Sequence, residues 1–154
     1  MALWKVLTGL ALALVAALFV LVARSRVAPE LGLVDDALRP CPDSPNCVSS
    51  LATDDGHRVE PIWRGDDASD EAWMRLESAV RGRAGTKVVM RRPDYLWAEF
   101  STSILGFVDD VEFHLDRGKG VIHVRSASRV GHSDLGANRK RVESLRAELE
   151  AALR

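Results

Sequence analysis

The longest apolar run of the chain lies at its N-terminus. Residues 6–23 carry no charged side chain, and only Thr8 and Gly9 interrupt their apolar character. As a helix this run would span roughly 27 Å at about 1.5 Å per residue, close to the hydrocarbon thickness of a bilayer. Side chains typical of the membrane interface flank it: Trp4, Lys5, Arg24 and Arg26. We predict a transmembrane helix within residues 1–26, in contact with the membrane over residues 4–24.

A cleavable signal peptide is the alternative interpretation of the same run. The stretch 21–29 offers no clean Ala-x-Ala cleavage site, and Pro29 would follow the best candidate bond. The run is also longer than the usual signal core of about 7–15 residues. A retained helix is therefore the preferred prediction. Counting positive charges does not orient this helix, because basic groups stand at both of its ends.

Shorter periodic segments follow a linker over residues 27–40, which proline and glycine interrupt. A helical pattern lies between Ser69 and Gly82, and a second one covers residues 134–153. The apolar stripe of the second helix has four members: Leu135, Val142, Leu145 and Leu149. Strands are predicted at about residues 58–64, 86–91, 95–101, 108–116 and 120–128.

The last two strands form the clearest hairpin. Placing Asp116 opposite Val121 puts most apolar side chains of both strands on one face. Polar pairs then fall on the other face: Glu112 with Arg125, and His114 with His123. A slip of one residue would mix the two faces, so the pattern favours this register. The paired histidines suggest a metal site or a pH response, but we expect a solvated polar face.

The order strand, helix, four strands and helix predicts an α+β fold. We expect an N-terminal transmembrane helix, then a small antiparallel sheet of about five strands with two helices packed on one face. The apolar stripes of the two helices would be buried against that face. We divide the chain into the helix with its flanking charges at 1–26, the linker at 27–40 and a single domain at 41–154.

Charge and motifs exclude several classes of protein. The 154 residues include 21 basic and 22 acidic side chains. Setting aside Lys5, Arg24 and Arg26 leaves 18 basic against 22 acidic residues, a net of −4, whereas nucleic-acid-binding domains are usually basic. The sequence contains no nucleophile-elbow, zinc-protease, P-loop or dinucleotide motif, and its histidines lack the spacing of a metal site. We predict no cofactor, no metal and no nucleic-acid partner.

The two cysteines bear on the compartment. Cys41 and Cys47 flank a turn-rich stretch, across which a disulfide is sterically feasible. Such a bond would suit an oxidising compartment. Free thiols or a redox role are the alternatives. We predict the disulfide and, with it, a single-pass protein of the inner membrane whose domain lies on the periplasmic side.

The densest polar stretch of the chain spans residues 126–141. Asn138 falls on the apolar stripe of the last helix, and a buried amide there needs partners. One interpretation is a buried bracket in which Asn138 and Arg129 tie the loop to the sheet. The sharper one is a small site for an anion or lipid headgroup that uses Arg129 and Arg139 near the helix start. The candidate ligand-binding residues are Ser126, Ser128, Arg129, Ser133, Asp134, Asn138 and Arg139.

Four segments resemble the family called Domain of Unknown Function 1499. They are residues 41–50, 104–113, 125–131 and 133–139, and they occur in that order. The resemblance covers about residues 40–150 and leaves the N-terminal helix outside. It implies an envelope protein of bacteria or a plastid relative, often with a signal or anchor, and it brings no established activity.

The preferred prediction of function is a non-enzymatic binding or accessory module at the surface of a cell-envelope membrane, with a lipid or an envelope protein as partner. An enzyme of unfamiliar type is the alternative, and its acid–base candidates are Asp110, Glu112, His114 and Arg129. Asp109 would point to the opposite side of its strand. A structural role in an assembly is a third hypothesis, because Gly9 and Ala13 form a small-xxx-small pair.

Overall fold

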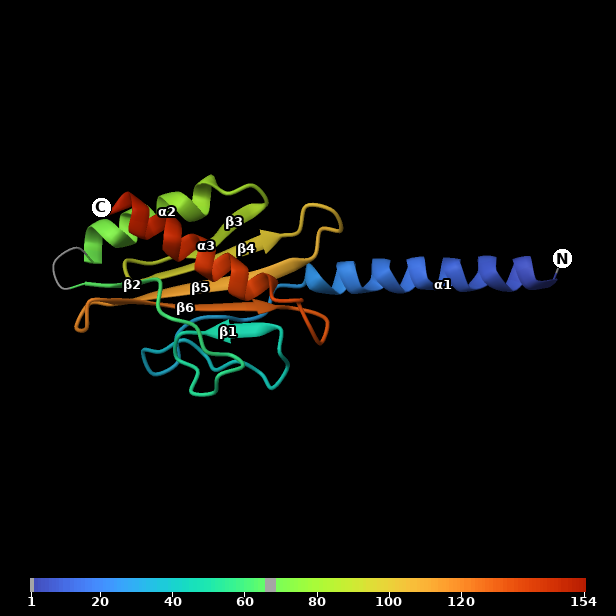
Figure 1. The fold of residues 1–154 in the computed structure, drawn as a ribbon, viewed down its shortest axis with the longest axis horizontal. Helices are drawn as coiled ribbons and strands as arrows, with labels where there is room; N and C mark the ends of the chain where they lie inside the picture. The colour runs from blue at the N-terminus through green and yellow to red at the C-terminus, as the bar shows by residue number, and fades with distance from the viewer. Residues whose placement is uncertain (1, 66–68) are drawn as a thin grey trace.

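The computed structural model describes residues 2–65 and 69–154. An apolar helix, α1 (Ala2–Ser25), extends away from the rest of the chain along the long axis of the molecule (Figure 1). Its side chains are almost all exposed, and Ser25, its last residue, is buried. In the described part of the chain it is the one helix long and apolar enough to cross a membrane. The predicted N-terminal apolar helix is confirmed, and a membrane anchor and a signal sequence both fit it.

The rest of the fold is built on an antiparallel sheet. Within the described residues it has six strands, in the order β1-β6-β5-β4-β3, with β2 also paired to β6. Their bounds are β1 Cys47–Ser49, β2 Trp63–Arg64, β3 Thr86–Arg91, β4 Tyr95–Ser101, β5 Val108–Asp116 and β6 Val121–Ser128. Neighbouring strands run antiparallel throughout. The predicted α+β class is therefore confirmed.

The register of the β5–β6 hairpin is the predicted one. Asp116 pairs with Val121, which places Phe113 opposite Val124 on the apolar face. On the polar face the predicted partners also meet: Glu112 with Arg125, and His114 with His123. The two-residue periodicity of a strand fixes this register, because any slip would exchange the faces.

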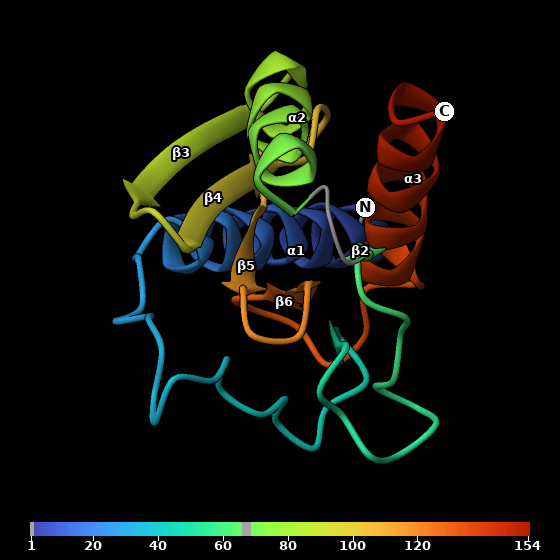
Figure 2. The same cartoon turned by 90° about the vertical axis from the view of Figure 1, so that its left-hand side faces the viewer.

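Two helices, α2 (Ser69–Gly82) and α3 (Ala137–Ala152), cover one face of this sheet (Figure 2). Their apolar stripes meet the apolar face of β4, β5 and β6 in one core. Fully buried members of that core include Leu76, Val80, Phe113, Leu145 and Leu149. Burial of each such side chain contributes roughly 1.5–3 kcal/mol, so this layer supplies most of the apolar stabilisation.

The opposite face of the sheet is covered too. The segment between α1 and β1 crosses on the side away from α2 and α3 (Figure 2), and its Leu38 packs with Tyr95 and Trp97 of β4. Polar side chains of the hairpin on this face are buried: Asp110, Glu112, His114 and Arg125. The expectation of a solvated polar face is therefore wrong for these residues, because the chain after α1 folds back over the sheet.

Two short strands differ from the sequence-based expectation. β1 lies at the end of a stretch that was expected to be turns, and it forms because Cys47 pairs with Ala127 of β6. The strand expected at 58–64 is reduced to Trp63 and Arg64. Both outcomes reflect pairing with β6 rather than any local alternation of side chains.

Helix α3 begins at Ala137, three residues later than expected. Asp134 accepts hydrogen bonds from the backbone N–H groups of Gly136 and Asn138, at 3.0 and 2.7 Å. Gly136 adopts a positive φ of 80° directly before the helix, a conformation that glycine tolerates. Leu135 is 90% exposed, so its expected place in the apolar stripe is wrong.

Candidate functional site

The loop between Cys41 and Cys47 is hydrogen-bonded to the end of β6 and to the loop that follows it. Cys41 and Cys47 form a disulfide, as predicted. Next to it, the backbone carbonyl of Asn46 accepts a hydrogen bond from the N–H of Ser128 at 2.9 Å. The side chain of Asn46 donates to the carbonyl of Gly131 at 2.7 Å. The entry to the domain and the loop after β6 therefore hold each other in place.

Asn138 joins three elements as a buried bracket. Its amide nitrogen donates to the Asn46 carbonyl at 2.9 Å and to the Ser128 hydroxyl at 3.0 Å. Its amide oxygen accepts from the Ser126 hydroxyl at 2.6 Å. Arg141 donates to the same oxygen and also pairs with Asp109 at 2.6 Å. The fully buried amide thus has the partners that its place in an apolar stripe requires.

Arg129 lies at the centre of a second buried polar cluster. Its Nε and Nη2 donate to the two carboxylate oxygens of Asp110 at 2.7 and 2.6 Å. Nη2 also donates to Glu99 at 2.7 Å, and Trp97 donates to Asp110 at 2.8 Å. Burial lowers the pKa of Arg129, but the bonds to Asp110 and then Glu99 outweigh burial and raise it. The guanidinium is a permanent cation held by two carboxylates.

The same arginine reaches the apolar helix. Its Nη1 donates to the backbone carbonyl of Ser25 at 3.0 Å. The Ser25 hydroxyl accepts from the N–H of Val108 at 3.3 Å, and Ser25 is fully buried. The end of α1 is therefore built into the sheet at β5 and β6 and does not hang from it by a flexible link.

A hollow of about 240 Å³ opens where α1 meets the sheet. One side comes from the chain around and after the end of α1, and the other from β5 and β6. The lining residues are Arg24, Val27, Pro29, Leu31, Asp110, Arg125, Ala127, Ser128 and Arg129. Three cationic groups and a single carboxylate line it. We refer to it as the basal hollow.

Arg125 brings unused hydrogen-bonding capacity to the basal hollow. Its Nη1 donates to Glu112 at 3.1 Å, and Tyr95 donates to the other oxygen of that carboxylate at 2.6 Å. Burial, followed by the bond to Glu112, raises the pKa of Tyr95. The Nε of Arg125 is buried and finds no acceptor within residues 2–65 and 69–154. Arg24 is exposed, and the described residues give it no ion-pair partner.

A second hollow, also of about 240 Å³, lies on the α3 side of β6. It is lined by Thr102, Phe107, Val108, Asp109, Ser128, Val130, Gly131, Ser133, Asp134 and Ala137. Both of its carboxylates are engaged, since Asp109 pairs with Arg141 and Asp134 accepts backbone N–H groups. No cationic side chain is among the residues that line it.

The predicted ligand-binding residues do not form one site, because they lie in the Asn138 bracket, in the two hollows and, for Arg139, at a separate position. Ser126 and Asn138 belong to the bracket, and Ser133 and Asp134 line the second hollow. Ser128 lines both hollows, and Arg129 lines the basal one. Arg139 lies elsewhere and donates to the backbone carbonyls of Arg58 and Gly56 at 2.7 and 2.9 Å. Ligand binding by these residues stays a prediction.

Two of the three arginines that line the basal hollow were not among the predicted ligand-binding residues. Arg24 was interpreted as an interfacial anchor, and Arg125 as the partner of Glu112. Arg24 lies near Arg129 because the adjacent Ser25 is bound to Arg129 and Val108, whereas Arg125 lies on β6 itself. The sequence carried a partial signal, because Arg125 and Arg129 are spaced to lie on one face of the strand and its continuation.

The acid–base candidates of the enzyme hypothesis are arranged as follows. Asp110 and Glu112 are buried against Arg129 and Arg125, while Asp109 points to Arg141 on the other side of the sheet. The His114 and His123 rings lie 6.5 Å apart, and His123 Nδ1 is 3.1 Å from the Ser50 hydroxyl. Residues 2–65 and 69–154 contain no cluster of three His, Cys, Asp or Glu side chains placed to hold a metal. These carboxylates are occupied by arginines in this conformation.

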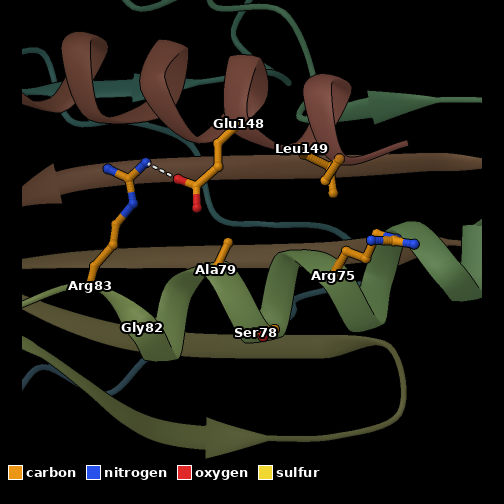
Figure 3. Close-up of a pocket in the computed structure, with 8 residues that line it drawn as sticks. Arg75, Ser78, Ala79, Gly82, Arg83, Glu148 and Leu149 are labelled. Carbon is orange, nitrogen blue, oxygen red and sulfur yellow. Dashed lines mark hydrogen bonds and ion pairs between the residues drawn. The ribbon is translucent and has the colours of Figure 1, made fainter. Parts of the chain in front are cut away.

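The groove between α2 and α3 is the alternative location for a ligand-binding site. It has a volume of about 360 Å³ and is lined by Arg75, Ser78, Ala79, Gly82, Arg83, Glu148, Leu149 and Ala152. Figure 3 shows Arg83 and Glu148 reaching toward each other across it, and they form an ion pair at 2.6 Å. Arg75 pairs with Glu71, so each charged side chain of the groove has an ion-pair partner, although the Nε of Arg83 finds no acceptor within residues 2–65 and 69–154.

Comparison with known proteins identifies one family. The sequence profile described as "Protein of unknown function (DUF1499)" matches residues 37–149, which covers all of the strands and most of α3. No curated protein and no solved structure matches the chain. The matched region contains both polar clusters and most of the lining of the basal hollow, but α1 lies outside it.

Proposed function

The chain belongs to the DUF1499 family, whose function is unknown, and on that premise we propose that it is a membrane-anchored, extracytoplasmic domain that binds a phosphate-bearing lipid headgroup in the basal hollow. α1 is the retained anchor in this proposal, and it crosses the membrane once. The observation that carries the binding role is the gathering of Arg24, Arg125 and Arg129 around one hollow at the end of α1.

The contacts of Ser25 favour a retained helix over a signal peptide. Cleavage in the stretch 21–29 would cut the chain beside this buried residue or remove it. Loss of Ser25 would leave the Arg129 Nη1 and the Val108 N–H without their acceptors. An unmade hydrogen bond at a buried group costs about 1–3 kcal/mol. A signal peptide has no such reason to be part of the mature fold.

The disulfide favours an extracytoplasmic location for the domain. Cys41 and Cys47 are bonded to each other, and disulfides persist in oxidising compartments such as the bacterial periplasm. With α1 crossing the membrane, the domain then lies outside the cytoplasm. An intact mass under non-reducing conditions, lower than the reduced mass by a pair of hydrogens, would support this side.

The chemistry of the basal hollow favours an anion. Arginine recognises phosphate through paired hydrogen bonds. Arg129 is held by Asp110 and Glu99, and Arg125 pairs with Glu112, but Arg24 has no ion-pair partner among the described residues and the Nε of Arg125 has no acceptor there. The volume lies below the roughly 300–1,000 Å³ of pockets that take drug-sized ligands, so it suits one small group such as a headgroup phosphate. Arg24 follows the apolar run directly and would lie at the level of the headgroups.

The test uses the full chain in a mild detergent and native mass spectrometry. Short-chain phosphatidylglycerol is the probe, with short-chain phosphatidylcholine and inorganic phosphate as separate arms. We expect a stoichiometric phosphatidylglycerol adduct on the wild type and a marked loss of it in Arg24→Gln. Displacement by inorganic phosphate would show that the phosphate alone is recognised. Arg24 is exposed, so its replacement leaves the fold intact.

Arg92→Gln is the matched control. Arg92 is also an exposed arginine, but it lies in the turn between β3 and β4, at the end of the domain away from α1 (Figure 1). Its variant should keep the full adduct. Equal adducts on all three proteins would overturn the headgroup proposal. Equal binding of phosphatidylglycerol and phosphatidylcholine, which share the phosphate, would show that the site recognises the phosphate and not the net charge of the headgroup.

A further inference from the structure

The most exposed large apolar side chains of the described chain lie on two loops. Ile104, in the loop between β4 and β5, is 91% exposed, and Leu135, in the loop before α3, is 90% exposed. Leu105, next to Ile104, is 46% exposed. Both loops lie at the end of the domain from which α1 leaves (Figure 1). Exposed apolar tips at this end point to an apolar environment beyond it.

The β4–β5 loop lies directly beside α1. Ile104 and Leu105 share a hollow of about 270 Å³ with three residues of α1, Leu18, Phe19 and Val22, and with Arg26 just beyond its end. The three α1 residues belong to the last two turns of the apolar run. Leu18 precedes the end of that run, Ala23, by about 7–8 Å at 1.5 Å per residue. The tip of the loop therefore reaches the depth of the last apolar turns of α1.

Several backbone groups of this loop are hydrogen-bonded within the loop itself, which suits an apolar environment. The N–H of Thr102 donates to the carbonyl of Phe107 at 2.8 Å, and the N–H of Gly106 donates to the carbonyl of Thr102 at 3.0 Å. The Thr102 hydroxyl accepts from the N–H of Phe107 at 3.0 Å. These bonds reduce the number of backbone groups that would need water, which is the main cost of placing a loop in lipid.

We propose that the β4–β5 loop inserts Ile104 and Leu105 into the same membrane leaflet as the C-terminal end of α1. The inference rests on the proposed function only in requiring that α1 stays in the bilayer. The occupant of the shared hollow is then lipid, because the α1 side chains that line it belong to the apolar run itself. Arg26 lines the same hollow and can extend its charged end toward the headgroups. With α1, the loop gives the domain a second contact that fixes its orientation on the membrane.

The experiment measures the depth of a tryptophan at position 104. Full-length wild type and Ile104→Trp are reconstituted in liposomes with and without brominated phosphatidylcholine, and the wild-type emission is subtracted. We expect the added emission to be blue-shifted, quenched by the brominated lipid and protected from aqueous acrylamide. Met74→Trp is the matched control, because Met74 is an exposed apolar residue on α2. Its added emission should be quenched by acrylamide and unaffected by bromination.

Three outcomes separate the possibilities. A position-104 signal that behaves like that of Met74→Trp would overturn the insertion. A blue-shifted signal that bromination does not quench would also overturn it, because protein rather than lipid would then cover the loop. Failure of the full chain to float with the liposomes would contradict the retained anchor instead. An undiminished phosphatidylglycerol adduct in Arg24→Gln would overturn the headgroup proposal and leave the insertion result unaffected, so the two proposals fail separately.

Discussion

Arg129 Nη1 donates a hydrogen bond to the backbone carbonyl of Ser25 at 3.0 Å, across 104 positions of sequence. The bond joins the end of β6 to the last residue of the apolar helix. The other nitrogens of the same guanidinium hold Asp110 and Glu99. One side chain therefore couples the position of α1 to the buried charge cluster of the sheet, so the direction in which the helix leaves the domain is part of the fold.

Replacing Arg129 by alanine should strongly destabilise the domain. The change would leave Asp110 buried without its cation and remove the partner that, against the effect of burial, lowers the pKa of Glu99. Breaking a buried pair in this way costs about 3–5 kcal/mol. Urea unfolding of the full chain in detergent, followed by tryptophan fluorescence, would measure the loss in free energy of unfolding.

The control for that variant is Lys140→Ala. Lys140 is exposed on α3, and an exposed substitution of this kind usually changes stability by less than about 0.5 kcal/mol. A loss in Arg129→Ala no larger than in Lys140→Ala would show that the cluster is not held by this arginine.

Replacing Asn138 by alanine or by aspartate should lower the stability of the domain. Asn138→Ala removes one of the two donors to the Asn46 carbonyl, which keeps the N–H of Ser128, and leaves the Ser126 O–H without its acceptor. A buried group left unsatisfied costs about 1–3 kcal/mol. Asn138→Asp replaces the donating nitrogen with an oxygen that faces the Asn46 carbonyl, so it should be at least as damaging. Thermal unfolding of the full chain would rank the variants. An Asn138→Asp protein as stable as wild type would contradict the bracket.

Two histidines should give opposite pH dependences of stability. The hydrogen bond to Asp54, followed by the contact with the Ser44 carbonyl, raises the pKa of His57. Its contribution is therefore complete below the unfolded pKa of about 6.5 and is lost as the pH rises through the folded pKa. Burial, followed by the charge of His114, lowers the pKa of His123. His123 therefore penalises the folded state as the pH falls below about 6.5 toward its folded pKa.

The measurement compares His57→Gln and His123→Gln with wild type between about pH 5 and 8, where histidine titrates. Relative to wild type, His57→Gln should lose most stability at the acidic end and little at the alkaline end. His123→Gln should gain at the acidic end relative to the alkaline end. The same pH trend in both variants would contradict at least one of the two assignments.

The elements that the sequence predicts well are those with a long repeating pattern. The β5–β6 register follows from the alternation within strands of nine and eight residues, and it places Glu112 opposite Arg125 as expected. β1 has only three residues and no alternation, so nothing local identifies it. Its strand character comes from pairing with β6, which is a tertiary effect.

The burial of the polar face of β5 and β6 was not predicted, for a different reason. The solvated face was expected from Glu112 and His114, yet β4 carried a contrary signal, because Tyr95 and Trp97 alternate with Leu96 and are buried as well. A strand apolar on both faces lies between two layers. The sequence does not say which segment provides the second layer. The basal hollow could not be predicted for the same reason, since it needs Arg24 brought back beside β6.

The retained helix is open to a direct test. We expect the protein extracted from membranes to have an intact mass that includes residues 1–25, because Ser25 is buried and supplies two acceptors to the sheet. A form in which residues 1–25 are replaced by a cleavable signal should be less stable by about 1–3 kcal/mol for each acceptor lost. Ser25→Ala separates the two contacts, because it removes the hydroxyl bonded to Val108 and keeps the carbonyl bonded to Arg129. It should therefore lie between wild type and the truncated form. A mature mass that begins within residues 22–30, with undiminished stability, would instead identify α1 as a signal peptide.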